Sequence, residues 1–170
     1  MNIKKVNIAL KIFIVILFAL SIVSTVYAND GIDINNRTNY YVTSDFSNDN
    51  IQTMISKANN GDTFEFISQN YDNISLIIDK QLKIISNKNS TISVNPSLSD
   101  KALNLGINNT FGFYFTQNSS GSLLSGFNII AASADYAVIL NKSSNTIIEN
   151  NAISQAVNNV ILKNSSNVLI

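Results

Sequence analysis

Short apolar runs alternate with polar turns along most of the chain. The runs are rich in Ile, Val and Phe, and residues such as Asn, Ser, Gly and Asp separate them. Bursts of β-branched and aromatic residues between such turns are typical of β-strands. The pattern predicts short strands at residues 63–67, 74–78, 82–85, 91–94, 102–105, 111–115, 122–124, 127–130, 137–140, 146–148, 153, 160–162 and 168–170.

Part of this pattern occurs more than once. The sequence AVILNKSSNTII at residues 137–148 returns as NVILKNSSNVLI at residues 159–170, with an offset of 22. Residues 113–124 are a looser copy, with an offset of 24. Short strands fit a sandwich or a solenoid, but a sandwich has no reason to repeat its turn chemistry in register. We therefore expect an all-β fold, a parallel β-helix of about 22–24 residues per coil, with Val138 and Val160 on neighbouring parallel strands.

The segment before the first predicted strand has the pattern of a short amphipathic helix. Asp49 or Asn50 is expected to cap its N-terminus. One face carries the apolar residues Ile51, Met54, Ile55 and Ala58. We expect this helix to plug the open end of the solenoid, where an uncapped coil would expose unpaired backbone. The predicted organisation is a polar leader at 29–47, a capping helix and turn at 48–62, and coils at 63–170.

Residues 1–28 have the pattern of a secretory signal peptide. Three lysines precede an uncharged, mostly apolar stretch at residues 12–26, and Ala28 provides a small residue at a cleavage point. The alternative is an uncleaved membrane anchor, but these 15 residues are fewer than the roughly 20 that a spanning helix needs. We expect cleavage after Ala28, export to the medium or the cell surface, and no membrane insertion thereafter.

Charge and cysteine content narrow the possible partners. Removal of residues 1–28 would leave 8 basic and 11 acidic side chains, a net charge of −3, so nucleic acid is not an expected partner. The chain has no cysteine, and a solenoid is stabilised by interfaces between coils instead of disulfides. Without His or Cys, borderline metals lack their usual ligands, so we expect no metal site and no cofactor.

Catalytic chemistry finds little support in the sequence. The acidic residues from position 62 onward form no Asp-Asp or Asp-x-Asp pair; they are Asp62, Glu65, Asp72, Asp79, Asp100, Asp135 and Glu149. Glycoside hydrolysis needs two carboxyl groups that converge within about 5–10 Å. The chain has no His, and its single arginine, Arg37, precedes the predicted coils. We therefore interpret these acids as solvated turn residues and expect no catalytic site.

Two asparagines occupy the same place in successive copies of the repeat. Asn145 and Asn167 each end a Ser-Ser-Asn turn. Asparagine accepts the left-handed backbone conformation, and stacked amides pass hydrogen bonds from coil to coil. We expect a ladder of Asn145 above Asn167; turn propensity without a ladder is the alternative explanation.

The last copy of the repeat reaches Ile170 without a polar capping segment. An uncapped coil leaves an apolar edge with unpaired backbone groups. We expect this edge to be covered by further coils of a longer chain, of which these residues are a fragment, or to pair with another chain.

Four segments carry a resemblance to a known family: IQTMISKANNGDTFEF at 51–66, DKQLKII at 79–85, SGFNI at 125–129 and ENNAI at 149–153. With them, residues 48–170 resemble right-handed parallel β-helix proteins of the pectate-lyase-like superfamily, most of all its secreted adhesin-like proteins. The resemblance implies a right-handed coil. It leaves the function open, because the superfamily includes lyases, hydrolases, metal-delivery accessory proteins and non-catalytic surface proteins. Its members are usually longer than this chain, which favours a fragment.

Aromatic residues give the remaining candidates for ligand contact. Strand alternation at residues 111–115 sends the three phenylalanines to the core and Tyr114 to the opposite, exposed face. Tyr114 and Tyr136 are thus the candidates for carbohydrate contact. We expect a non-catalytic, secreted or cell-surface, adhesin-like module that presents Asn, Ser and Tyr groups to glycans or partner proteins. The alternatives are the N-terminal part of a polysaccharide lyase or glycoside hydrolase with catalytic coils beyond residue 170, and a structural surface spacer.

Overall fold

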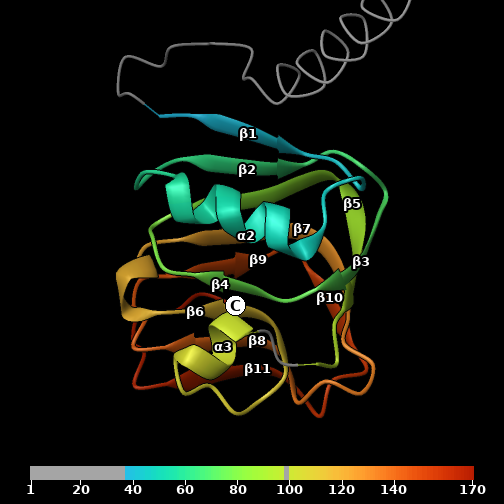
Figure 1. Cartoon of the computed structure of the whole chain (residues 1–170). Helices are drawn as coiled ribbons and strands as arrows, with labels where there is room; N and C mark the ends of the chain where they lie inside the picture. The colour runs from blue at the N-terminus through green and yellow to red at the C-terminus, as the bar shows by residue number, and fades with distance from the viewer. Residues whose placement is uncertain (1–36, 98–99) are drawn as a thin grey trace, which may run out of the picture. The chain divides into compact units, whose positions relative to one another are not determined.

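The computed structural model describes residues 37–97 and 100–170, and these residues are mostly β-strand (Figure 1). The expected signal peptide at 1–28 and the first part of the leader lie outside the described residues. The strands are β1 (Asn39–Val42), β2 (Thr63–Phe66), β3 (Asn70–Ile74), β4 (Leu76–Ile78), β5 (Lys83–Val94), β6 (Phe111–Phe115), β7 (Leu123–Ile130), β8 (Tyr136–Asn141), β9 (Ile147–Glu149), β10 (Ala152–Ser154) and β11 (Asn158–Lys163). The helices are α2 (Asn48–Lys57), α3 (Asp100–Asn104) and the short 3-10 turn η1 (Gln117–Ser119).

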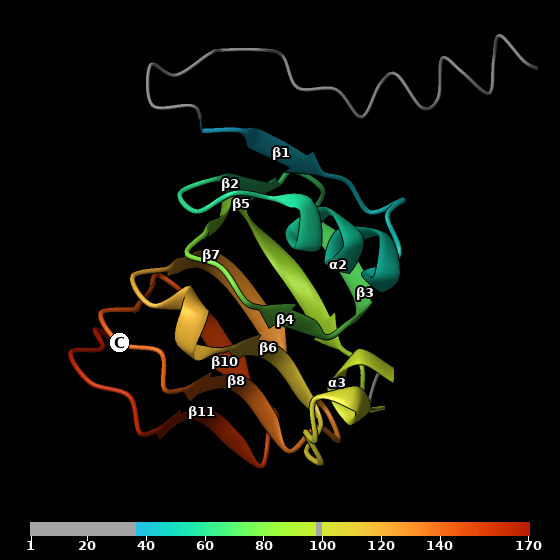
Figure 2. The same ribbon diagram turned by 60° about the vertical axis from the view of Figure 1, so that its left-hand side comes forward.

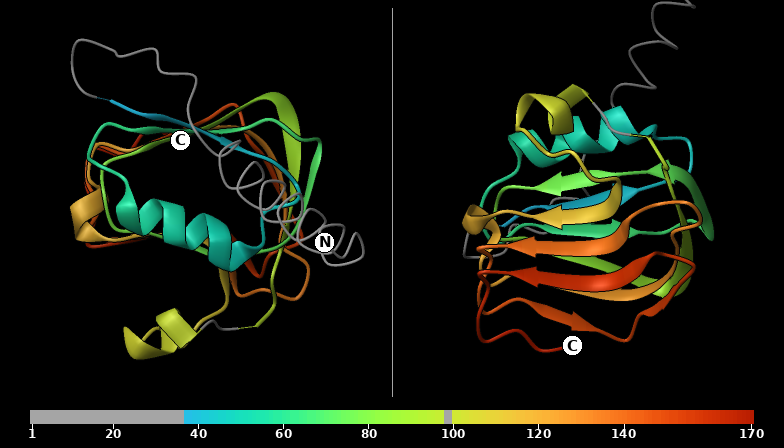
Figure 3. Two further views of the ribbon diagram at one scale, coloured as in Figure 1. Left: turned by 45° about the horizontal axis from the view of Figure 1, so that its top comes forward. Right: turned by 90° about the horizontal axis from the view of Figure 1, so that it is seen from below.

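The strands form two sheets in which every pair is parallel. The first sheet has the order β1-β2-β5-β7-β10, with β3 beside β5 and β9 beside β7. The second sheet has the order β11-β8-β6-β4, and its strands stack one below another in Figure 3. The chain crosses the first sheet, then the second, and then returns to the first; we call each such round a passage.

The register repeats from one passage to the next. Val138 lies opposite Val160 on neighbouring parallel strands, as the repeated sequence predicts. Most paired strands are offset by 20 to 25 residues. The offset grows to 37 between Leu76 and Phe113, because the segment containing α3 is inserted there. The looser copy of the repeat has an offset of 24, which would place Phe113 opposite Ala137. In the structure Phe113 lies opposite Val138, so β6 and β8 are shifted by one residue from that alignment.

The main core contains side chains from both sheets. Ile84, Phe127 and Ile129 come from the first sheet, and Phe113 and Leu140 come from the second. The rings of Phe113 and Phe127 lie 6.0 Å apart between centroids, so they contact each other across the interior. Because apolar residues of every passage share this one cluster, each passage is stabilised by its neighbours.

Helix α2 begins at residue 48, where the predicted capping helix begins, but its cap is not the expected one. Its N-cap is Ser47, and the expected caps Asp49 and Asn50 lie inside the helix. The Ser47 hydroxyl accepts a hydrogen bond from the Asn50 backbone N–H, and the Asn50 side chain accepts one from the Ser47 N–H, both at 3.2 Å. This reciprocal pair satisfies two amides at the start of the helix. The expected apolar face is confirmed, since Ile51 and Ile55 are buried in the main core.

The helix also covers the edge of the second sheet, beside β4 (Figure 2). The Asn48 side chain accepts from the Ser75 N–H at 2.8 Å, and the Gln52 amide bonds both backbone groups of Ile77. Helix α2 follows β1, which pairs with β2. The expectation of a leader up to residue 47 is therefore wrong for β1, because this strand already belongs to the first sheet.

Helix α3 replaces the strand expected at residues 102–105. It packs on the outer face of the second sheet, where a separate cluster of buried side chains comprises Ile77, Ala102, Ile107, Phe111, Tyr114 and Ile139. An ion pair of 3.7 Å between Lys101 and Asp79 ties the helix to the end of β4.

Within the described residues, no helix has the length and apolar character needed to cross a bilayer.

Candidate functional site

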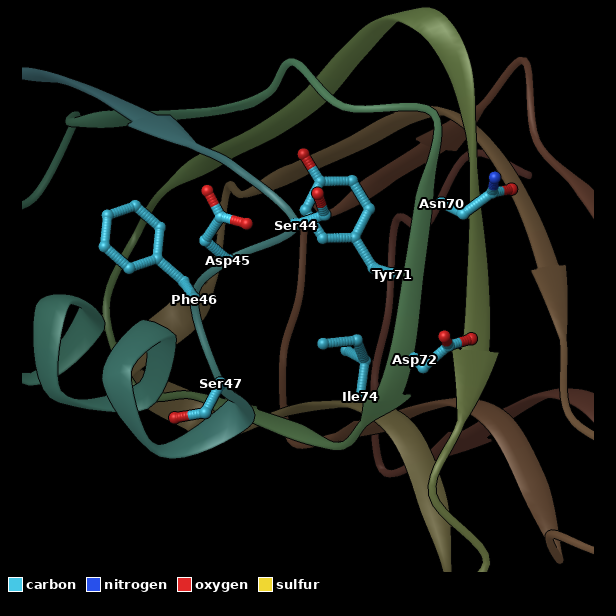
Figure 4. Close-up of a pocket in the computed structure, with 8 residues that line it drawn as sticks. All are labelled: Ser44, Asp45, Phe46, Ser47, Asn70, Tyr71, Asp72 and Ile74. Carbon is cyan, nitrogen blue, oxygen red and sulfur yellow. The ribbon is translucent and has the colours of Figure 1, made fainter.

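A pocket opens between the loop that precedes α2 and strand β3 (Figure 4). Its volume is about 250 Å³. The residues that line it are Ser44, Asp45, Phe46, Ser47, Asn70, Tyr71, Asp72 and Ile74. We call it the loop pocket. Its two walls come from successive passages, so the stacking of the chain creates it.

Tyr71 holds the two walls together. Its hydroxyl donates to the carbonyl of Val42 at 2.6 Å and accepts from the Ser68 N–H at 2.8 Å. Ser44 adds a bond from its N–H to the Ser68 hydroxyl at 3.0 Å. Burial raises the pKa of the Tyr71 phenol above its ordinary value of 10.0, so the side chain stays a neutral donor. The loop is thereby fixed against β3.

Three polar side chains on the rim are free to meet a ligand. Asp45, Asn70 and Asp72 are exposed, and within the described residues none of their side chains takes part in a hydrogen bond or ion pair. Half-buried Phe46 adds an aromatic ring packed against the main core. Carboxylate and amide groups bind hydroxyls, and an aromatic ring offers an apolar face to the C–H side of a sugar. No basic side chain lines the pocket, which leaves it with two uncompensated negative charges.

The sequence pattern does not predict that these residues lie together. It places Asp45 in a polar leader and Asp72 in an isolated turn. Their proximity depends on the pairing of β1 with β2 and on the position of Ser47 as the helix cap. The sequence signal was the Ser-Asp-Phe-Ser run just before the amphipathic helix, in which Ser47 precedes the apolar face at cap spacing.

Tyr114 is not the exposed residue that strand alternation predicts. It is only 8% exposed, beneath α3 in the outer cluster, and its hydroxyl accepts from the Asn141 side-chain amide at 2.7 Å. Tyr136 is half-buried beside the same cluster, and the Lys163 ammonium lies 5.4 Å from the centre of its ring. The platform expected from Tyr114 is therefore absent, and Tyr136 alone retains some exposure.

Strand β6 departs from the expected alternation at Phe111 as well, and it is closely packed at Gly112. A Cβ at Gly112 would lie 2.7 Å from the carbonyl oxygen of Ala137 and 2.8 Å from a methyl group of Val94, so β6 approaches its neighbours closely there. Phe111 joins Tyr114 in the outer cluster instead of entering the main core. With α3 above them, both faces of β6 are covered, and its five residues are all buried.

Asn145 and Asn167 lie one above the other. The Asn167 amide donates to the Asn145 side-chain oxygen at 3.3 Å, and both residues have left-handed backbone, with φ of 53° and 55°. The neighbouring hydroxyls of Ser144 and Ser166 are 3.1 Å apart. This corner thus presents a column of small polar groups along the stack.

The interpretation of the acids as solvated turn residues is wrong for two of them. Asp62 is fully buried, and its two oxygens accept from the N–H groups of Thr38 and Asn59, each at 2.8 Å. Asp135 accepts from the Thr110 N–H at 2.9 Å and from its hydroxyl at 3.0 Å. These bonds hold the pKa of Asp135 below its ordinary value of 3.8. Each carboxylate therefore links two successive passages at a turn of the chain.

A second pocket of about 400 Å³ lies at the opposite corner of α2. It is lined by Ala58, Asn59, Asn60, Asp79, Lys80 and Asn118. The Lys80 ammonium donates to the carbonyls of Ile55 and Ser56 at the end of the helix, and Asp79 pairs with Lys101. Its charged groups are thus already engaged, unlike those of the loop pocket.

Across the described ranges, no three His, Cys, Asp or Glu side chains gather as a metal site would require.

The comparisons with known proteins identify no relative. No protein-family model, curated protein or solved structure matches the chain. The function is therefore inferred from the residues of the pocket and from the repeated architecture.

Proposed function

We propose that the chain is a right-handed parallel β-helix, similar to pectate-lyase-like proteins, and serves as a non-catalytic glycan-binding module of an exported, adhesin-like protein. The repeated parallel register and the core shared by both sheets support the β-helix. The apolar stretch at residues 12–26 supports export.

The loop pocket is the observation that carries the binding function. Its lining includes the free carboxylates of Asp45 and Asp72, the amide of Asn70 and the aromatic ring of Phe46. Asp45 and Phe46 come from the loop, whereas Asn70 and Asp72 extend from the far side of β3 (Figure 4). Hydroxyl-rich ligands need several polar partners together with an apolar surface for their C–H faces. The scaffold is rigid here because Tyr71 joins the walls, so little ordering of the loop opposes binding.

One observation favours a second candidate, a glycoside hydrolase. Asp45 and Asp72 line the same pocket, and hydrolases of this type use two carboxyl groups, one as acid and one as base or nucleophile. Of the other acids, Asp62 and Asp135 accept from backbone amides, Asp79 forms an ion pair, and Glu65 accepts from the Asn87 side chain. If the chain cleaves glycans, Asp45 and Asp72 are the first pair of carboxyl groups to test.

A glycan array followed by solution titration tests the proposal. We expect the exported chain to bind at least one neutral or amino-bearing glycan, and Asp72→Asn and Phe46→Ala each to weaken that binding about tenfold or more. Glu149→Gln removes an exposed acid outside the pocket lining and is the matched control. Release of reducing ends from the bound glycan would establish the hydrolase. Silence across the array would refute glycan binding and leave the spacer function.

Export is tested separately. The proposal requires cleavage after Ala28 when the chain is produced in an exporting host, which intact-mass measurement of the secreted protein detects. A retained N-terminus, with the protein held in the membrane fraction, would contradict it.

A further inference from the structure

Helix α3 and the turn that follows it contribute few apolar side chains to the sheet that they cover. Within the described residues, those that reach the outer cluster are Ala102 and Ile107. Leu103 and Leu105 instead meet solvent, at 53% and 58% exposure. A helix of five residues is not stable through its own backbone bonds. The hydrophobic force that keeps α3 on the sheet is therefore small.

The polar contacts beneath α3 are incomplete. Nζ of Lys101 lies 3.7 Å from Oδ2 of Asp79, which is too long for a hydrogen bond. In the described part of the chain, this Nζ, Oδ1 of Asp79 and the Thr116 hydroxyl are buried and have no hydrogen-bond partner. Buried polar atoms without a partner are rare, and they destabilise the arrangement that buries them. Movement of α3 away from the sheet separates Lys101 from Asp79 and lets water or a ligand reach both.

Strand pairing fixes the face that lies beneath α3. Ile77 pairs with Tyr114, and Tyr114 pairs with Ile139, on three successive parallel strands. Asp79 and Thr116 directly follow the last paired residues of β4 and β6. We call these five residues the covered face. It combines an aromatic ring and aliphatic side chains with a carboxylate oxygen and a hydroxyl that lack partners.

We propose that α3 acts as a flap and that the covered face, once open, is a second glycan contact of the chain. The Tyr114 ring and the isoleucines meet the C–H groups of a sugar, and Oδ1 of Asp79 and the Thr116 hydroxyl meet its hydroxyls. This inference rests on the proposed glycan binding, because a glycan is a ligand that uses both kinds of group. A glycan that binds only the open form shifts α3 toward that form.

Thiol labelling tests the opening of α3 without any glycan. The chain has no cysteine, so Ile139→Cys introduces a single reporter beneath α3. Leu140→Cys is the matched control, because this neighbour on β8 is equally buried but belongs to the main core. We expect a maleimide to label the Ile139→Cys thiol at least about 100-fold faster, since opening of α3 suffices there and Leu140→Cys requires unfolding. Ile77→Cys and Ile78→Cys repeat the comparison on β4 if the first pair does not fold. Equal rates within the folded pair would overturn the flap.

The ion pair at α3 provides a second test of the flap. Lys101→Ala removes the buried ammonium and should speed labelling of the Ile139→Cys thiol about tenfold. Lys88→Ala removes an exposed lysine of β5 and should change the rate by no more than about twofold. The same rate in both lysine variants would refute a role for the contact with Asp79.

Protection of the same thiol by glycans tests the ligand. The probes are the neutral hexasaccharides of glucose, N-acetylglucosamine and mannose, each in excess. We expect at least one to slow labelling of the Ile139→Cys thiol about tenfold, because a bound sugar covers it. Asp79→Asn should abolish this protection, and Glu149→Gln, an exposed acid of β9, should not. Protection that survives Phe46→Ala would show a contact separate from the loop pocket. Glycan binding without protection would leave the loop pocket alone and overturn the second contact.

Discussion

Gln52 and Ile77 are joined by two hydrogen bonds that imitate a strand pair. The Ile77 N–H donates to Oε1 of Gln52 at 2.8 Å, and Nε2 of Gln52 donates to the Ile77 carbonyl at 3.0 Å. A side-chain amide has the same donor and acceptor as a peptide group. One glutamine on α2 therefore closes the edge of β4, which would otherwise leave two backbone groups unpaired.

Replacement of Gln52 by Ala is expected to lower the free energy of unfolding by about 1–3 kcal/mol, because both backbone groups of Ile77 lose their partner. Urea denaturation of the exported chain measures the change. Gln117→Ala is the control, since the Gln117 side chain is exposed and makes no hydrogen bond in the described part of the chain; it should change stability by less than about 0.5 kcal/mol. Equal effects of the two substitutions would refute a role for the amide.

Two glycines with left-handed backbone should respond differently to alanine. At Gly126, with φ of +85°, a Cβ would overlap the carbonyl oxygen of Ser86. At Gly106, with φ of +69°, nothing lies within 4 Å of the added atom. We expect Gly106→Ala to lower the free energy of unfolding by about 1 kcal/mol, because only the left-handed backbone is strained by the new side chain. Gly126→Ala should cost more than about 3 kcal/mol or prevent folding. Similar midpoints in urea for the two variants would contradict this geometry.

Two substitutions of Asn145 can distinguish the contribution of its left-handed backbone from that of its hydrogen bond to Asn167. Gly121 occupies the equivalent place in the preceding passage, also with left-handed backbone, and donates its N–H to Ser144 just as Asn145 donates to Ser166. Asn145→Ala should therefore lower the free energy of unfolding by about 1 kcal/mol, because alanine is strained in this conformation. Asn145→Gly should lower it by only about a few tenths of a kcal/mol. Thermal and urea unfolding measure both. If glycine proves as harmful as alanine, the side-chain bond to Asn167 matters more than the backbone.

Stability should fall in acid partly through Asp135. Hydrogen bonds from Thr110 lower its pKa in the folded state, so the carboxylate stabilises the fold above the ordinary pKa of 3.8. This stabilisation is lost as the pH falls through the lower, folded-state pKa. A carboxyl-detected NMR titration should give a value below 3.8 for Asp135, and Asp135→Asn should flatten the acid limb of the stability curve. A titration midpoint at or above the ordinary value would exclude this role.

The repeated sequence was sufficient to predict the parallel register of β8 and β11. Identical turn chemistry recurs every 22 residues there, and Val138 and Val160 consequently pair. The apolar face of α2 was equally clear, because Ile51 and Ile55 follow helical spacing. These features depend on local pattern alone, and a single sequence contains that information.

Features that depend on contacts between distant segments were not predictable. The apolar run at residues 102–105 is too short for its period to separate a strand from α3. Tyr114 was expected on an exposed face because nothing in the sequence shows that α3 folds back over it. The loop pocket likewise required the positions of Asp45 and Asp72 on different passages.

The segment between Val94 and Phe111 lengthens one passage, yet Leu76, Phe113 and Val138 still stack in line across it. The additional polypeptide leaves the first sheet at the end of β5 and enters the second sheet at β6, and the strands on either side keep their register. Foreign sequence, such as an epitope or an affinity tag, can therefore be grafted at this corner in place of the native excursion. Any such graft must supply its own apolar cover for Ile139 and Tyr114.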